Sequence, residues 1–242
     1  APPADVPQDW WGQVRKDIAA SEYSVTWQDK TVLPEVAAAY QAPNRAHDLR
    51  TYFTESGPQV VRRTETEPTW TWGLELVRVA ECGLSHEERG DVAPPVDELA
   101  ADGNRIEYRR GGVTEWYVNS DKGLEQGFTI SGADALGSSS ALSALSTVVI
   151  DLAVRGDLTP DLMPDGETIE FLSAGGVGLV HYGHLKAYDA TGRELSASME
   201  LVDSSTEAVI RLSVDIASAV FPVTIDPLAT SPEIGRASCR ER

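Results

Sequence analysis

The run Val148-Val-Ile-Asp-Leu-Ala-Val154 decides the fold class of this 242-residue chain. Its aliphatic side chains at even positions fall on one side of an extended strand and Asp151 on the other, because successive side chains of a strand point to opposite faces. The same period of two recurs at 195–201, 208–214 and 219–225. Roughly twelve such runs, separated by turn residues, predict an all-β fold of antiparallel sheets packed face to face as a β-sandwich.

Turn-rich stretches divide the chain into parts. Residues 1–20 hold a Pro-rich leader and a short N-terminal helix, the only helix that we expect. Residues 21–100 are expected to form a first β subdomain and residues 101–228 a second one. The boundary follows from the Gly-, Pro- and acid-rich stretch 81–104, which interrupts the strand pattern. Residues 229–242 then hold the start of a linker and a tail.

Prolines constrain the closing strand of the second subdomain. Pro222 has no amide hydrogen for the ladder, so this strand should lie at a sheet edge or point Pro222 outward. Asp226-Pro227 is expected to end the strand, since proline does not continue a central ladder.

The charge of the chain excludes some partners. A formal net charge of −18 repels phosphate groups and anionic lipid, so we do not expect nucleic acid binding. No window approaches 18 consecutive apolar residues, which predicts no membrane span. The opening Ala1-Pro-Pro-Ala4 lacks the basic and apolar regions of a signal peptide, so such a peptide is absent from this chain.

The final segment stands apart from the rest. Glu233-Ile-Gly-Arg-Ala-Ser-Cys-Arg-Glu-Arg242 resembles the translation of a common sequencing adapter, and we interpret residues 233–242 as an artefact; the alternative is a genuine Arg-rich tail. Without this tail, Cys82 is the one remaining cysteine. The sequence therefore predicts neither a disulfide framework nor a cysteine-based metal site.

The acidic residues do not predict a catalytic site. A glycosidase needs two carboxylates about 5 to 10 Å apart in a cleft, but several glutamates alternate with apolar neighbours and therefore indicate the solvent-facing sides of strands. These are Glu107, Glu115, Glu125 and Glu170. We predict no catalytic residue, no enzymatic activity and no cofactor.

One acidic turn is a candidate metal site. Asp161, Asp165 and Glu167 surround the turn Pro164-Asp-Gly166 and could hold Ca²⁺ loosely. Asp side chains also stabilise turns without any ion, and this alternative stays open.

Three tryptophans allow two interpretations. Trp70, Trp72 and Trp116 could form a flat exposed platform that stacks on sugar rings, as in a carbohydrate-binding module. Their period-two spacing also fits core residues between two sheets, and large aromatic side chains are usually buried. Their exposure distinguishes the two interpretations.

Several segments together resemble a known family. They are Tyr108-Arg-Arg-Gly-Gly-Val-Thr-Glu-Trp-Tyr-Val-Asn119, Gly123-Leu-Glu-Gln-Gly-Phe128, Gly192-Arg193 and Phe221-Pro-Val-Thr-Ile-Asp-Pro-Leu228. This set resembles the N-terminal β module of large bacterial extracellular proteins, where the module precedes FG-GAP (integrin-α-like) or similar β-propeller repeats. The chain itself contains no such repeat and no Asp-x-Asp-x-Asp-Gly calcium loop, so propeller and calcium functions do not transfer to its residues.

The resemblance implies a non-catalytic structural or interaction module of a secreted or cell-surface bacterial protein. Such a module caps or presents a downstream β-propeller-type region, because a repeat array otherwise exposes an apolar end. The expected partner is that repeat domain of the same full-length protein, with a glycan or a surface protein as a further partner. The alternative, from another functional class, is the carbohydrate-binding module with exposed tryptophans.

Overall fold

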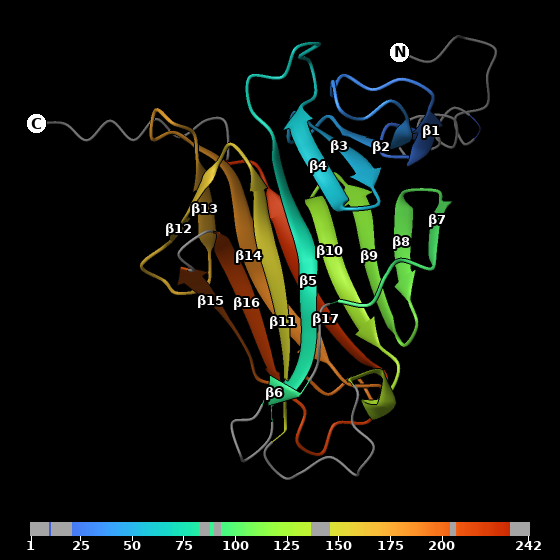
Figure 1. Ribbon diagram of the computed structural model, residues 1–242, viewed down its shortest axis with the longest axis vertical. Coiled ribbons are helices and arrows are strands. Elements are labelled where there is room, and N and C mark those ends of the chain that lie inside the picture. Colours follow the sequence, from blue (N-terminus) through green and yellow to red (C-terminus); the bar gives the residue numbers. More distant parts are fainter. Residues whose placement is uncertain are drawn as a thin grey trace, which may run out of the picture.

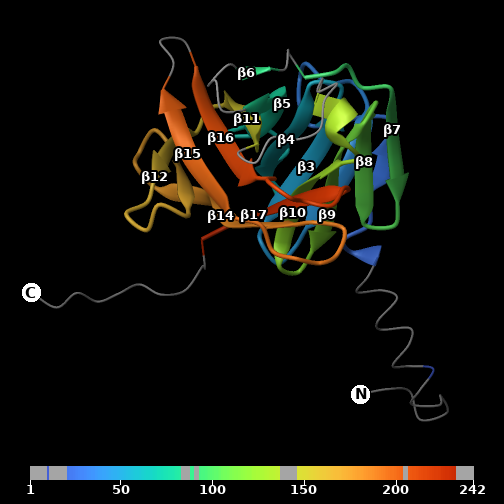
Figure 2. The same cartoon turned by 90° about the horizontal axis from the view of Figure 1, so that it is seen from below.

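The computed structural model confirms the all-β sandwich. It describes residues 10, 21–82, 88–89, 93–136, 146–203 and 207–232. These residues form two antiparallel sheets whose inner faces pack against each other (Figures 1 and 2). The expected N-terminal helix lies in residues 1–20, of which only Trp10 is described, and the adapter-like segment 233–242 also lies outside the described residues. No described helix has the length and apolar character that crossing a membrane requires.

The first sheet runs, in spatial order, through eight strands, and a short ninth strand, β6 (Glu88–Arg89), pairs with β5. The order is β1 (Thr26–Gln28), β2 (Ala39–Asn44), β3 (Leu49–Thr54), β4 (Gly57–Arg62), β5 (Trp72–Cys82), β11 (Thr147–Gly156), β16 (Ala208–Asp215) and β15 (Ala197–Asp203).

The second sheet has eight strands among the described residues. Its order is β12 (Thr159–Leu162), β13 (Ile169–Leu172), β14 (Gly178–Tyr188), β17 (Val223–Thr230), β10 (Gly123–Ile130), β9 (Val113–Ser120), β8 (Arg105–Arg110) and β7 (Glu98–Asp102). A short 3-10 turn, η1 (Ala133–Leu136), follows β10.

The strand that decided the fold class lies in the middle of the first sheet. β11 pairs with β5 on one side and β16 on the other, and Val148, Ile150 and Leu152 are fully buried. Asp151 faces the outer side, where Arg211 Nε and Nη2 donate to its carboxylate at 2.7 and 2.9 Å. The alternation of apolar and polar side chains therefore sets the two faces of this strand, as expected.

The core joins both halves of the sequence. Phe53 of the first sheet packs on Tyr117 of the second, with ring centroids 5.3 Å apart, and Trp72 packs edge-on against Phe171 at 4.9 Å. Residues 21–100 and 101–228, which we expected as two β subdomains, thus share one core, and strands of both ranges share the first sheet.

The closing strand differs from the expectation. β17 is not an edge strand but lies between β14 and β10, and Pro222 precedes it. The strand also continues through Pro227 to Thr230 instead of ending there. On the neighbouring strand β14, the pairing shifts between Gly183 and Lys186, opposite this proline. The bulge occupies the position where Pro227 has no amide hydrogen to donate, which makes a proline acceptable inside the sheet.

Candidate functional site

The three tryptophans considered for sugar stacking are buried. Trp70, Trp72 and Trp116 are 7%, 3% and 6% exposed. Trp70 and Trp72 belong to the core between the sheets. These side chains therefore do not form the exposed platform that the carbohydrate-binding alternative requires, because the sheets close over two of them and other side chains cover the third.

Trp116 lies on the outer face of the second sheet. Its neighbours in β9, Glu115 and Tyr117, point inward, so its own side chain points outward. The indole lies on the backbone of β10, since a Cβ atom added at Gly127 would be 2.0 Å from Trp116 Cζ2. Nε1 donates to Thr129 Oγ1 at 3.1 Å, and the Arg105 guanidinium carbon lies 4.3 Å from the ring centroid. A sugar could stack here only by displacing Arg105.

A carboxyl pair lies next to this tryptophan. Glu125 of β10 pairs with Leu228 of β17, which places Asp226 one diagonal step away on the same face. Burial, followed by the nearby Glu125 carboxylate, raises the pKa of Asp226 to about 7, and Lys186 on β14 opposes that rise. Asp226 therefore carries a proton over much of the pH range below 7 and can donate it to Glu125.

The acidic turn uses its central carboxylate internally. Asp165 Oδ1 accepts hydrogen bonds from the backbone N–H groups of Glu167 and Thr168, at 2.9 and 3.0 Å. The bond from Glu167 holds the pKa of Asp165 below its ordinary value. Asp161 lies in the edge strand β12, and the described part of the chain contains no cluster of three residues that could hold a metal ion. The contacts of Asp165 are those of a turn stabilised by its own side chain.

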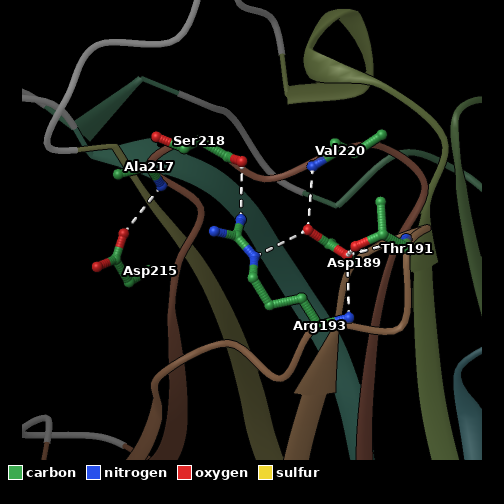
Figure 3. A network of polar contacts seen from close by, with 7 residues as sticks. All are labelled: Asp189, Thr191, Arg193, Asp215, Ala217, Ser218 and Val220. Carbon is green, nitrogen blue, oxygen red and sulfur yellow. Dashed lines mark hydrogen bonds and ion pairs between the residues drawn. The ribbon is translucent and has the colours of Figure 1, made fainter.

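A buried aspartate ties two loops together at one end of the sandwich (Figure 3). Asp189 follows β14 and accepts from Thr191 Oγ1 at 2.6 Å, from the backbone N–H groups of Thr191 and Arg193, and from that of Val220. Arg193 Nε donates to the same carboxylate at 3.1 Å, and Arg193 Nη2 donates to the Ser218 carbonyl at 2.7 Å. These bonds, that of Thr191 Oγ1 first, hold the pKa of Asp189 far below its ordinary value. The network fixes the β14–β15 loop against the β16–β17 loop.

Glu115 does not face solvent as the sequence predicted. Its side chain is fully buried, because β9 points this position into the core. Tyr117 Oη and Gln126 Nε2 donate to Glu115 Oε1 at 2.6 and 3.1 Å, and Arg110 Nη2 lies 3.4 Å from Oε2. Tyr182 extends the network by donating to Gln126 Oε1 at 2.7 Å. Burial raises the pKa of Glu115. The partners of this carboxyl are core side chains, as expected of a structural network.

The opposite end of the sandwich holds polar contacts that the sequence did not reveal. The backbone N–H of Ser231 donates to His47 Nδ1 at 3.1 Å, which makes Nδ1 the acceptor and leaves the proton on Nε2. Nε2 in turn donates to the Asp121 carbonyl at 3.2 Å. Asn119 Nδ2 donates to the Tyr23 carbonyl at 2.9 Å. Residues near both ends of the described chain are thus fixed at this end of the sandwich (Figure 1).

A cavity of about 180 Å³ opens beside His47, between the two sheets. The Nε1 atom of Trp70 is buried and has no hydrogen-bond partner among the described residues. Arg62 lies 3.9 Å from Asp48 and 3.9 Å from Glu65, beyond hydrogen-bonding distance. The cavity is lined by His47, Asp48, Leu49, Arg62, Trp70, Gly178, Leu179, Ser231 and Pro232.

Comparisons with known proteins give little beyond the fold class. No model of a known protein family and no curated protein matches the chain. Two similar solved structures are of the family GH92 α-mannosidase BT3965 from Bacteroides thetaiotaomicron, the second of them in complex with mannoimidazole. The identities are 13% and 14%, the TM-scores 0.34 and 0.33, and the match covers 79% of this chain but 29% of the enzyme. At these TM-scores the likeness carries no argument about function.

Proposed function

We propose that the chain is a non-catalytic module of a secreted or cell-surface bacterial protein, and that it holds the region after residue 232 in a fixed position. The observation that carries this proposal is the clamp at His47. One imidazole bonds the Asp121 carbonyl with Nε2 and the Ser231 backbone with Nδ1, so the segment leaving β17 is fixed to the body of the sandwich. A side chain that fixes an exit segment in this way limits the motion of whatever follows it.

The buried carboxyl groups support a structural role. Glu115 and Asp189 are each enclosed by several donors of the chain itself, on different parts of the fold. Such groups stabilise a fold and fix its loops, and their donors are already engaged. The partner we propose is a downstream β-propeller-type region of the same full-length protein, as the family resemblance implies.

The continuation of the gene past codon 232 tests this proposal. We expect FG-GAP-type repeats in the translated continuation. An in-frame stop shortly after this codon, or a catalytic domain in place of repeats, would refute the proposal.

The extended chain then tests the clamp. We expect His47→Ala to accelerate proteolytic cleavage of the junction near Ser231 several-fold and to loosen the coupling between the two domains in ¹⁵N relaxation. The matched control is His184→Ala, which changes an exposed histidine on β14. Equal cleavage rates in the wild type and both variants would show that His47 does not fix the junction.

A further inference from the structure

The cavity beside Trp70 contains a buried donor that the fold itself does not use. The indole N–H of Trp70 has no partner among the described residues, although its side chain is more than nine-tenths buried. Buried polar groups in native proteins are almost always hydrogen-bonded, and an exception calls for an explanation. Since Trp70 lines the cavity, a molecule held there is positioned to accept this hydrogen bond.

Two charged side chains at the cavity complete a set of complementary groups. Arg62 offers donors and Asp48 offers acceptors, and their mutual distance of 3.9 Å is too long for a hydrogen bond between them. Arg63 Nε also stays 3.7 Å from the Asp48 carboxylate. Both groups therefore retain bonding capacity for a ligand. Hydroxyl groups suit this pair, because each hydroxyl donates to a carboxylate and accepts from a guanidinium.

The remaining lining and the overall charge narrow the ligand class. Leu49, Leu179 and Pro232 supply apolar surface opposite the polar groups. Asp48 at the site and the net charge of −18 disfavour an anion. A volume of about 180 Å³ exceeds that of a few water molecules, at roughly 30 Å³ each in the liquid, and is smaller than the usual drug-sized pocket of ~300–1,000 Å³.

We propose that this cavity binds a single neutral sugar unit, whose hydroxyls bond Trp70, Arg62 and Asp48 and whose C–H face lies on the apolar lining. The unit is either a free monosaccharide or the terminal residue of a glycan. This site differs from the exposed platform considered from the sequence, because Trp70 acts through its N–H group and not by stacking. It is also independent of the role proposed for the whole chain, so either proposal can fail alone.

The test is a titration of the 242-residue chain with neutral monosaccharides. Glucose, galactose, mannose and N-acetylglucosamine are added separately up to about 10 mM, and binding is followed by calorimetry and saturation-transfer NMR. A neutral glycan array distinguishes the two sources, because a glycan-end site binds immobilised glycans more tightly than it binds the free sugar. We expect at least one sugar to bind with a dissociation constant in the millimolar range or below.

Two variants locate the binding in this cavity. Trp70→Phe removes the N–H group and keeps the ring, and we expect it to weaken binding about 5- to 10-fold. Arg62→Ala should weaken binding about 10-fold or more, because hydrogen bonds to charged groups are stronger. The matched controls are Trp116→Phe and Arg109→Ala, which change the outer face of the second sheet and should leave binding unchanged.

Two results would overturn the proposal. One is the absence of binding to any neutral sugar, free or immobilised, by the folded wild-type chain. The other is sugar binding that Trp70→Phe and Arg62→Ala leave unaffected while both variants keep the wild-type circular dichroism spectrum. In the first case the cavity holds water alone; in the second, the sugar binds elsewhere.

Discussion

Replacing Asp226 with asparagine should stabilise the protein at alkaline pH and leave its stability unchanged in acid. Asp226 is half-buried beside Glu125, and burial followed by that carboxylate raises its pKa from 3.8 to about 7. A group whose pKa is raised on folding contributes its full stability below pH 3.8, and this contribution is lost as the pH rises through about 7. Asparagine has no charge to desolvate, so the variant avoids the loss.

The magnitude follows from the size of the pKa change. A rise from 3.8 to about 7 corresponds to an upper limit of about 4 kcal/mol, at ~1.4 kcal/mol for each tenfold change in proton affinity. Solvent screens a half-buried carboxyl, and the variant also loses the attraction to Lys186. We therefore expect Asp226→Asn to raise the free energy of unfolding by about 1–2 kcal/mol at pH 8, or the melting temperature by roughly 2–8 °C.

The assay is urea denaturation of wild type and variant at each pH between 4 and 8. The difference in the free energy of unfolding should be near zero at pH 4 and reach its full value by about pH 8. Asp161→Asn, an exposed aspartate on the edge strand β12, is the matched control and should give a small difference that does not vary with pH. An Asp226→Asn variant that is less stable than wild type at pH 8 would refute the reasoning.

Three further substitutions test the packing and the buried networks. Gly127→Ala places a methyl group against the Trp116 ring and should lower the free energy of unfolding by about 1–3 kcal/mol in urea denaturation, while Gly175→Ala, which meets no atom closer than 3.8 Å, should cost much less. Glu115→Leu leaves a buried guanidinium and two other donors without their acceptor, and we expect a loss of about 3–5 kcal/mol by the same measurement. Asp189→Ala removes the acceptor that joins two loops, so amide hydrogen exchange should accelerate in both loops before it changes in the core strands; unchanged exchange there would contradict the assigned role.

The sequence predicted the fold class because its main signal is local. The apolar period of two in 148–154 depends only on the geometry of a strand, and β11 has the expected faces. Strand order depends on contacts between distant residues, so the pairing of β5 with β11 and the central place of β17 did not follow from the pattern. The bulge opposite Pro227 belongs to β14, a different segment, and a rule about proline in one strand does not include it.

The candidate sites were harder to predict than the fold, for a physical reason. A glutamate between apolar residues usually faces water, but Glu115 faces inward because Tyr117, Gln126 and Arg110 supply its bonds. The contact between His47 and Ser231 joins residues 184 positions apart, and no local spacing signals it. The composition of the turn around Asp165 correctly left two interpretations open, because a turn aspartate and a calcium ligand look alike in sequence.

The segments that carry the family resemblance serve the interior and the closure of the sandwich. Glu115 and Tyr117, within the run 108–119, form the buried network, and Asn119 joins the second sheet to the Tyr23 carbonyl. Arg193 is held by Asp189 where the chain enters β17, at the end opposite His47. A resemblance built on such residues tracks the fold, because the buried bonds constrain them whatever the surface does. Specificity in this chain must therefore come from residues outside these segments. The cavity lined by Asp48, Arg62 and Trp70 meets that condition, which makes the sugar titration a more direct measure of what this protein recognises than any further comparison of its core strands.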